Sequence, residues 1–284
     1  MIREETVFGP IYSRRLGTSL GVNLLPEKGK ICNFDCIYCE CGWNKDGRND
    51  TKLPSAAKVR ADLENKLEHL RRQEVTVDSI TFSGDGESTL NPEFPQIIDD
   101  TLALRDQLAP TAKVSVLSNA TQVHRPEIFK ALRKVDNPIM KIDAPTNELI
   151  ARVNNPAPGY DIAKVVESLK QFHGDFVLQT CMLRSHEYQF DSSSPEVLDG
   201  WMDIVRMLRP REVMVYTIDR PTPAQGLERF TAEEMTQLVQ PLIDEGFTIQ
   251  VRGYVPNKTF FLYINYFVYF CNSVRTAFAA LRTV

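Results

Sequence analysis

The chain has 284 residues, of which 43% are hydrophobic and 25% are charged, a composition that allows a full core and excludes a disordered protein. Its formal net charge of −4 at pH 7 argues against a broad basic surface for nucleic-acid phosphates. The N-terminal residues show no secretory signal. Because the cysteines do not form an obvious disulfide framework either, we expect a reducing, cytoplasmic setting.

The first segment with a clear local character runs from Ser13 to Gly21. It is polar and contains glycine, so we expect a loop there, followed by a short strand over 22–25. Arg14 and Arg15 lie in this loop. Each could be a solvated surface charge, or one of them could hold a carboxylate or phosphate with two hydrogen bonds.

A cluster of cysteines follows the first predicted strand. Cys32, Cys36 and Cys39 have the spacing C-x3-C-x2-C, and Cys41 lies just beyond them. Thiolates favour iron–sulfur clusters, zinc or copper(I). Three closely spaced thiolates can hold three irons of a cubane cluster and leave the fourth iron open to a ligand. The spacing therefore favours an iron–sulfur site.

The cysteine cluster is also compatible with a helix face, a zinc site or a disulfide. Positions 32, 36 and 39 could share one face of a helix, although the surrounding Pro26, Gly29 and Gly42 favour a loop. A structural zinc site would need Cys41 as its fourth ligand. A disulfide is disfavoured because the remaining cysteines, Cys181 and Cys271, are scattered along the chain.

Beyond the cysteines, strand patterns and helix patterns alternate. Ser55 is suited to cap the first of these helices, and Thr231 with Glu234 forms the pattern of a capping box at the last one. Six such alternations predict a parallel α/β sheet. The expected helices cover 54–73, 91–104, 126–132, 161–172, 195–208 and 231–245, and the expected strands cover 75–82, 113–117, 139–144, 176–183, 212–218 and 247–251.

Polar residues follow two of these strands. Gly84, Asp85, Gly86 and Glu87 come directly after the strand over 75–82, where glycines let the backbone approach a ligand closely. Many strand–helix turns have this composition, so the motif alone is weak evidence. Asn119 follows the next strand, where an Asx turn or a helix cap would also explain it.

Two later strands carry polar residues inside apolar runs. Lys141 and Asp143 alternate with apolar neighbours, so they share one face of their strand, unless Asp143 serves only a local turn or ion pair. Gln179 and Cys181 share a face in the same way. A buried free cysteine commonly behaves as a small hydrophobic residue, so we expect Cys181 to belong to the core.

The composition changes at residue 257. The stretch 260–270 is almost wholly aromatic or aliphatic, but it is shorter than the ~20 residues that span a bilayer. We therefore divide the chain into residues 1–256, an α/β domain with an N-terminal arm, and residues 257–284, a hydrophobic and basic tail of unknown role.

These motifs together resemble a known family. C-x3-C-x2-C with an aromatic residue, Tyr38, before the last cysteine resembles the signature of the radical S-adenosylmethionine (SAM) superfamily. The stretches 8–10, 13–17 and 19–22, together with the cysteine loop at 31–42, are similar to the wyosine-synthetase-like group within it. The resemblance runs from about Val7 to about Gly253, most of the chain.

The resemblance implies a fold, two cofactors and a site. The fold is a partial (β/α)6 TIM-like barrel with a parallel sheet and with its ligands at the C-terminal strand ends. Cys32, Cys36 and Cys39 would hold a 4Fe–4S cluster, and Gly84, Asp85, Gly86 and Glu87 would receive the methionine end of SAM. Tyr38, Asn119, Asp143 and Gln179 would line the nucleoside and the target, with Asp143 and Lys141 as candidate catalytic groups.

The resemblance also implies a reaction. An electron, supplied by a donor such as flavodoxin or ferredoxin, cleaves SAM to a 5′-deoxyadenosyl radical, which abstracts hydrogen from a substrate. The resembled group suggests modification of an RNA base, such as one in tRNA. A peptide or protein target, as for a glycyl-radical activating enzyme, is the alternative. A non-catalytic binding protein stabilised by zinc is the hypothesis from another class.

Overall fold

The computed structural model describes residues 5–13, 16–46 and 50–254. The chain divides into two compact units, Met1–Gly253 and Tyr254–Val284. Arg14, Arg15, Cys271 and the tail over 257–284 lie outside the described residues. The first unit contains all the elements named below.

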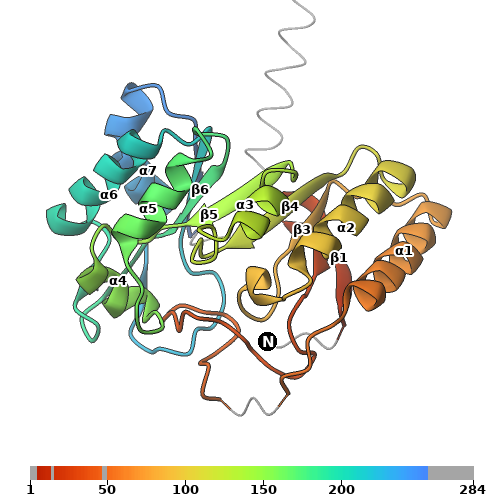
Figure 1. Cartoon of the computed structure of the whole chain (residues 1–284). Coiled ribbons are helices and arrows are strands. Elements are labelled where there is room, and N and C mark those ends of the chain that lie inside the picture. The colour runs from red at the N-terminus through yellow and green to blue at the C-terminus, as the bar shows by residue number, and fades with distance from the viewer. Residues whose placement is uncertain (1–4, 14–15, 47–49, 255–284) are drawn as a thin grey trace, which may run out of the picture. The chain divides into compact units, whose positions relative to one another are not determined.

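The core of this unit is a curled sheet with the strand order β1-β2-β3-β4-β5-β6-β9-β11 (Figure 1). All neighbours from β2 to β11 are parallel, and β1 alone pairs antiparallel with β2. The predicted partial barrel with a parallel sheet is confirmed. Its strands are β1 (Val7–Ser13), β2 (Gly17–Val22), β3 (Ser79–Phe82), β4 (Lys113–Ser118), β5 (Asn137–Lys141), β6 (Val177–Cys181), β9 (Glu212–Tyr216) and β11 (Ile249–Arg252).

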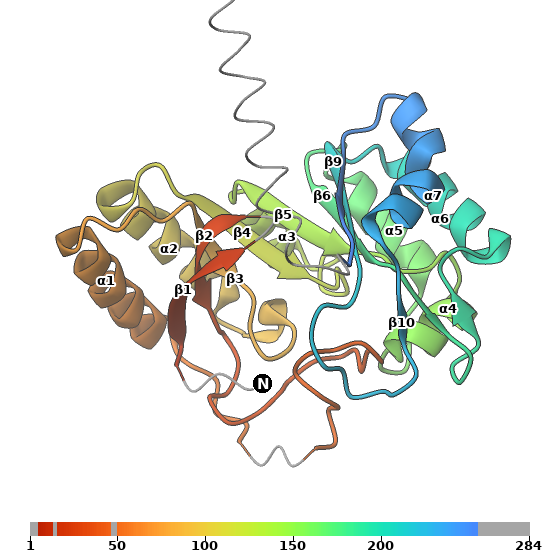
Figure 2. The ribbon, with the colours of Figure 1, turned by 180° about the vertical axis from the view of Figure 1, so that it is seen from behind.

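Helices cover one face of this sheet, as the two opposite views in Figures 1 and 2 show. Within the described ranges, no helix is both long and apolar enough to cross a membrane. The helices are α1 (Ala56–Arg72), α2 (Phe94–Leu108), α3 (Pro126–Leu132), α4 (Asn147–Asn154), α5 (Ile162–Lys170), α6 (Pro195–Leu208) and α7 (Ala232–Asp244), with a short 3-10 turn at Ser88–Leu90.

The helices form where their apolar periodicity and end caps predict them. In α1 the apolar residues at 3–4 spacing are buried against the sheet and α2, and the hydroxyl of Ser55 accepts a hydrogen bond from the Lys58 amide at 3.3 Å. At the start of α7, the side chains of Thr231 and Glu234 form the predicted capping box. Both predicted caps are confirmed.

The prediction of a loop over Ser13–Gly21 was wrong, because most of this segment is strand β2, paired with β1 in a hairpin. Its polar residues find partners inside the sheet instead of water. The Ser19 hydroxyl lies 2.7 Å from that of Thr81, and Gly21 leaves the space that the Phe8 ring occupies. Composition alone did not reveal these partners. Thr81 lies 62 positions from Ser19, and Phe8 belongs to the edge strand β1.

Two further elements differ from the sequence prediction. Helix α4 (Asn147–Asn154) is absent from the predicted elements, and its last residue proves central to the site below. Between the expected strand over 176–183 and the expected helix over 195–208, the chain forms the short strands β7 (Leu183–Ser185) and β8 (Phe190–Asp191), which with β10 (Glu228–Arg229) form a separate small sheet.

Hydroxyl groups form a buried ladder across strands β2 to β5. Thr81 binds Ser19, and the Ser79 hydroxyl lies 3.0 Å from the hydroxyls of both Thr81 and Ser115. Asn137 then donates to the Ser115 hydroxyl at 3.1 Å. Because each group has a partner, these polar side chains can be buried without leaving an unsatisfied hydrogen bond.

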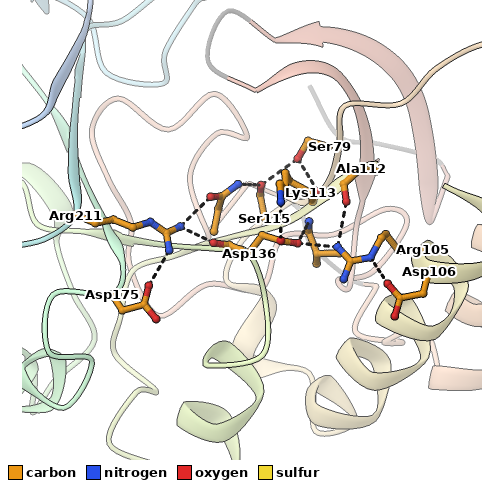
Figure 3. A network of polar contacts seen from close by, with 11 residues as sticks. Ser79, Arg105, Asp106, Ala112, Lys113, Ser115, Asp136, Asp175 and Arg211 are labelled. Carbon is orange, nitrogen blue, oxygen red and sulfur yellow. Dashed lines mark hydrogen bonds and ion pairs between the residues drawn. The ribbon is translucent and has the colours of Figure 1, made fainter. Parts of the chain in front are cut away.

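The N-terminal ends of the strands are tied by a charged network (Figure 3). The Asp136 carboxylate accepts hydrogen bonds from the Val114 amide at 2.9 Å and from the Arg105 guanidinium at 2.7 Å. Arg211 donates to Asp175 at 2.9 Å and to Asn137 at 2.8 Å. In parallel α/β folds the ligands bind at the other end of the strands, so we assign this network to stability.

Candidate functional site

The cysteine loop leaves the C-terminal end of β2 and crosses the strand ends. Backbone hydrogen bonds anchor it at both sides. On one side, the Ile31 amide donates to the Asp85 carbonyl at 3.2 Å, and the Glu87 amide donates to the Ile31 carbonyl at 3.0 Å. On the other side, the Asp35 amide donates to the Asn154 carbonyl at 2.9 Å. The loop is thereby fixed between the turn after β3 and the end of α4.

The three cysteines of the motif line one cavity of about 460 Å³. Each sulfur has its own polar neighbours. The Cys36 sulfur accepts a hydrogen bond from the Asn154 amide at 3.3 Å, and the Cys32 sulfur accepts one from the Phe34 backbone at 3.4 Å. The fourth cysteine, Cys41, donates from its sulfur to the Gly84 carbonyl at 3.8 Å. The predicted metal-binding residues are therefore brought together.

The arrangement bears on the alternative of a zinc site. Tetrahedral zinc holds its thiolates at about 2.3 Å, so all four sulfurs must surround one point. Among the described residues, no group of three or more His, Cys, Asp or Glu side chains is placed so that it could hold a metal ion. In a cubane cluster each thiolate binds a different iron, so the sulfurs need not meet at one point.

The protonation of the three thiols differs. Burial raises the pKa of Cys36 to about 11 and raises that of Cys32 further, so both favour the neutral thiol. Hydrogen bonding with Cys41 and the charge of the nearby Lys30 overcome burial and lower the pKa of Cys39 to about 6. Without a metal, Cys39 is therefore the thiol that most readily becomes a thiolate.

A buried lysine lies inside the cysteine loop. The Lys30 side chain is 1% exposed, and its ammonium donates to the Gly42 carbonyl at 2.7 Å and to the Asp35 carboxylate at 3.3 Å. Burial alone would lower the pKa of Lys30, but Cys39 and Cys32 outweigh it and hold the pKa above its usual value. No motif in the sequence distinguishes this lysine from those at the surface.

The turn after β3 is packed too tightly for side chains at its glycines. A Cβ atom on Gly84 would lie 2.0 Å from the Asn23 side-chain oxygen, and one on Gly86 would lie 2.0 Å from the Ile31 carbonyl oxygen. Gly86 also has a φ of +138°, which strongly favours glycine. Both glycines line the cavity, whereas Asp85 is not part of its wall and binds Asn23 instead.

The carboxylate of Glu87 joins this turn to the end of β4. It accepts hydrogen bonds from the Thr89 hydroxyl at 2.5 Å, from the Ser118 hydroxyl at 2.9 Å and from the Asn119 amide at 2.7 Å. Burial raises the pKa of Glu87 in spite of these donors. Glu87 also lines the cavity, so it both shapes the turn and contacts the ligand space.

Asn119 connects the end of β4 to the cysteine loop. Its side-chain oxygen accepts from the Thr121 amide at 3.1 Å, which is the expected Asx turn. Its side-chain nitrogen donates to the Asn33 side-chain oxygen at 2.7 Å and lies 3.9 Å from the Cys32 sulfur. The residue therefore serves the turn and also lines the cavity.

A polar cluster beneath the loop fixes Tyr38. The Tyr38 hydroxyl donates to the Asp143 carboxylate, and the Lys141 ammonium donates to that hydroxyl at 2.9 Å. Lys141 also donates to the Tyr216 hydroxyl at 2.9 Å and lies 3.9 Å from Asp143. Burial disfavours the charged lysine, but Asp143 and Tyr216 outweigh it and raise the pKa of Lys141.

Lys141 and Asp143 occupy different places in this cluster. Lys141 lines the cavity, as do Gln179 and Cys181 on the next strand. Asp143 is 2% exposed, lies outside the cavity wall, and also accepts from the Asn154 side chain and the Cys181 amide at 2.7 and 2.8 Å. Its contacts position Tyr38 and the loop. Cys181 is fully buried, as expected, but it belongs to the cavity wall as well as to the core.

Asn154 is the site residue that sequence reasoning missed. Its single side-chain amide lies within hydrogen-bond distance of the Cys36 sulfur, the Tyr38 hydroxyl and the Asp143 carboxylate, at 3.3, 3.1 and 2.7 Å. The sequence places it 118 positions from Cys36. No local motif marks this residue, because its partners come together only in the folded chain.

The rim of the cavity carries exposed side chains. Tyr12 is 79% exposed and lines the cavity together with Ile11 on β1. At another part of the lining, Arg220 forms an ion pair of 3.0 Å with Glu40 of the cysteine loop. This ion pair explains why Arg220 lies at the cavity, so its position alone does not indicate that it binds a ligand.

Comparison with known proteins identifies the class to which this fold and site belong. Residues 27–187, more than half of the chain, match the model of the Radical SAM superfamily. The chain belongs to this superfamily, whose members use a 4Fe–4S cluster and SAM.

Among sequence relatives, a UPF0026 protein of Helicobacter pylori is 30% identical over 220 residues, which cover 76% of this chain and 67% of that protein. A protein of Brachyspira hyodysenteriae named GTPase Obg is 28% identical over 239 residues, which cover 82% of this chain. The chain spans only 33% of that relative's length and about two thirds of the Helicobacter protein's length.

Solved structures share the fold at low sequence identity. Streptococcus suis SuiB bound to the precursor peptide SuiA is 15% identical with a TM-score of 0.58, and the match covers 81% of this chain and 48% of SuiB. TYW1 with a lysine–pyruvate adduct bound is 13% identical with a TM-score of 0.57, covering 82% and 76% of the two chains. AnSMEcpe with bound AdoMet is 15% identical with a TM-score of 0.55, covering 81% and 64%.

The residues of this chain fit the two cofactors of the superfamily. The sulfur donors are the ligand type that iron–sulfur clusters require. The cavity that they line has about 460 Å³, within the range of about 300–1,000 Å³ usual for ligand pockets. Its wall also includes the glycine turn and the strand ends at which ligands bind in such barrels.

Proposed function

We propose that this chain is a radical SAM enzyme in which Cys32, Cys36 and Cys39 hold a 4Fe–4S cluster. The observation that carries the proposal is that all three sulfur-bearing side chains line one cavity together with the glycine turn at Gly84 and Gly86. Both features lie at the C-terminal ends of parallel strands, where barrel enzymes place their sites.

Each part of the cavity has a role in this proposal. The turn at 84–87 receives the methionine end of SAM, since its glycines permit close backbone approach and Glu87 lines the same space. Tyr38, held by Asp143 and Lys141, forms the wall beside the nucleoside, with Asn119 and Gln179 further along the strand ends. When bound, the cluster and SAM supply a 5′-deoxyadenosyl radical, and the protein positions and shields the reactants.

The proposal is tested by release of 5′-deoxyadenosine. Protein reconstituted anaerobically with iron and sulfide is mixed with SAM and dithionite, and the product is measured by chromatography. We expect release from the native protein and none from Cys36→Ala. A native protein that binds zinc, contains no iron and releases no deoxyadenosine would overturn the proposal and favour the zinc-stabilised binding protein.

For the substrate we propose a base of an RNA. The proposal is supported by the resemblance of the N-terminal motifs to the wyosine-synthetase-like group and by the fold likeness to TYW1. The exposed ring of Tyr12 at the cavity rim is suited to stack on a base. The overall charge of −4 is the observation that opposes it.

A peptide target is the second candidate, supported by the equally close fold likeness to SuiB bound to its precursor peptide. The two substrates are separated by adding bulk tRNA or a peptide pool to the deoxyadenosine assay. If the substrate is an RNA base, we expect tRNA to stimulate deoxyadenosine release and Tyr12→Ala to weaken this stimulation. Stimulation by peptides alone would replace the RNA proposal with the second candidate.

A further inference from the structure

Buried Lys30 and partly exposed Asp35 form a charged pair at the cysteine loop to which the proposed function assigns no role. The Lys30 side chain is 1% exposed and that of Asp35 is 20% exposed, and the two are 3.3 Å apart. Burying an ammonium group is costly unless negative groups compensate it. The buried ammonium group of Lys30 therefore requires negatively charged groups close to it.

Asp35 compensates Lys30 only in part. The Asp35 carboxylate also accepts a hydrogen bond from the Asn44 amide at 2.8 Å, shorter than its contact with Lys30. A side-chain hydrogen bond also joins Lys30 to Cys39. The ammonium group is therefore shared between its carboxylate neighbour and a cysteine sulfur.

Lys30 also lies on the inside of the cysteine loop. It lines the same cavity as the three cysteines, and its contact with the Gly42 carbonyl at 2.7 Å keeps it between the two ends of the loop. A flexible surface lysine would be screened by water and salt, but a charge held in this buried position is screened much less.

We propose that Lys30 is a positioning residue whose fixed positive charge makes the cluster easier to reduce, and that Asp35 opposes this effect. The inference rests on the proposed function, since it requires the cluster. Three thiolates and an oxidised 4Fe–4S core of charge 2+ have a net charge of −1. One electron from a reductant brings this charge to −2, with no bond to carbon formed or broken.

The added negative charge is stabilised by a nearby cation, so reduction is favoured by Lys30 and disfavoured by Asp35. Net charge and burial are among the factors that set the potentials of such clusters. Loss of the Lys30 charge should shift the reduction equilibrium at least tenfold toward the oxidised cluster. For one electron, a tenfold change is about 59 mV.

The test is an anaerobic potential titration of the reconstituted protein, without SAM, with the reduced cluster followed by electron paramagnetic resonance. Lys30→Gln should lower the midpoint potential, Lys30→Arg should keep it, and Asp35→Asn should raise it. Lys28→Gln is the matched control, because Lys28 lies two residues away with an exposed side chain, and it should leave the potential unchanged.

The midpoint potential is expected to fall in Lys30→Gln and to rise in Asp35→Asn, and these opposite shifts distinguish an electrostatic role from a purely structural one. A structural role predicts lower iron content in the Lys30 variants and no rise of the potential in Asp35→Asn. An unchanged potential in Lys30→Gln with full iron content overturns the proposal. If the Lys30 variants lose the cluster, Asp35→Asn decides alone: a higher potential supports the proposal, and an equal or lower one overturns it. A native protein without any 4Fe–4S signal would instead refute the proposed function.

Discussion

The side-chain amide of Asn154 donates to the sulfur of Cys36 at 3.3 Å, across 118 positions of the sequence. The same amide reaches the Tyr38 hydroxyl and the Asp143 carboxylate. Because the Asn154 carbonyl also accepts from the Asp35 amide, this one residue holds the cysteine loop by backbone and side chain. The end of α4 is therefore part of the site.

Replacing Asn154 by alanine should impair assembly of the cluster. The Cys36 sulfur and the Asp143 carboxylate would lose a donor, and an interaction of this kind around a metal site is commonly worth about 10–100-fold in metal affinity or activity. We expect iron content after reconstitution to fall clearly below that of the native protein, as measured by a colorimetric iron assay and the visible spectrum.

The neighbouring Asn155 offers a matched control. It has a φ of +40° at the C-cap of α4, a conformation that glycine adopts readily, so Asn155→Gly should fold and bind iron normally. Equal iron content in Asn154→Ala and Asn155→Gly would contradict the role of the Asn154 side chain.

Asp143 is a candidate catalytic group by sequence, but its contacts suggest that it positions Tyr38. Asp143→Ala would leave the Lys141 ammonium without its nearby carboxylate and three hydrogen-bond donors without an acceptor. Breaking a buried charged pair costs about 3–5 kcal/mol. We expect a loss of this size in the free energy of unfolding, measured by urea denaturation of the metal-free protein.

Lys141→Met is the informative comparison. It removes the cation but leaves Asp143 with the donors from Tyr38, Asn154 and the Cys181 backbone. Lys141→Met should therefore lower the free energy of unfolding less than Asp143→Ala does. If Asp143→Ala unfolded at the same urea concentration as the native protein but lost deoxyadenosine release, Asp143 would be catalytic, as the sequence indicated.

The sequence predicted the elements of this fold well where local signals are strong. The apolar spacing in α1 and the capping box of Thr231 and Glu234 depend on residues within a few positions of one another, so they could be recognised. The polar strand β2 could not, because Ser19 is satisfied by Thr81, a partner 62 positions away. For such segments tertiary contacts override local composition.

The same distinction applies to the site. The cysteine spacing and the turn at 84–87 are compact motifs, and the structure brings both to one cavity. Lys30 and Asn154 have no motif of their own, since their importance lies in what they contact after folding. Residues that hold the ligand-binding residues in place through tertiary contacts are therefore the ones that sequence patterns fail to show.

Gly86 should not tolerate a side chain. Its Cβ would collide with the Ile31 carbonyl at 2.0 Å, which is backbone and cannot turn aside, and its φ of +138° is unfavourable for alanine. Gly86→Ala should move the start of the cysteine loop and lower iron content. Gly159→Ala serves as control, because this glycine also has a positive φ but has open space around it. Normal iron binding in Gly86→Ala would show that the loop does not depend on this close contact.

Cys41 distinguishes a three-cysteine cluster from a four-cysteine zinc site. Its sulfur donates to the Gly84 carbonyl, and we expect Cys41→Ser to keep the iron and sulfide of the native protein. Cys36→Ser should lose them, because three thiolates are required for three irons. Metal analysis of both variants checks this, and loss of metal in both to the same extent would favour the zinc hypothesis.

Asp136 lies away from the site, at the N-terminal ends of the strands. Burial raises the pKa of this carboxyl, but the Val114 amide and the Arg105 guanidinium outweigh it and lower the pKa below its usual value. Ionised Asp136 therefore stabilises the folded chain at neutral pH. This contribution is present above the unfolded pKa of about 3.9 and is lost as the pH falls through the lower folded value.

Asp136→Asn should accordingly lower the free energy of unfolding at pH 7 by about 1.5–3 kcal/mol, the usual worth of a hydrogen bond to a charged group. The difference from the native protein should shrink as the pH is lowered below about 4. Asp106→Asn is the control, because Asp106 binds the same Arg105 but is 70% exposed, and its loss should cost less than about 1 kcal/mol. Urea denaturation of the three proteins at about pH 7, 5 and 3 provides the measurement. A difference for Asp136→Asn that stays constant over this range would mean that packing around the side chain, and not its charge, stabilises this end of the sheet.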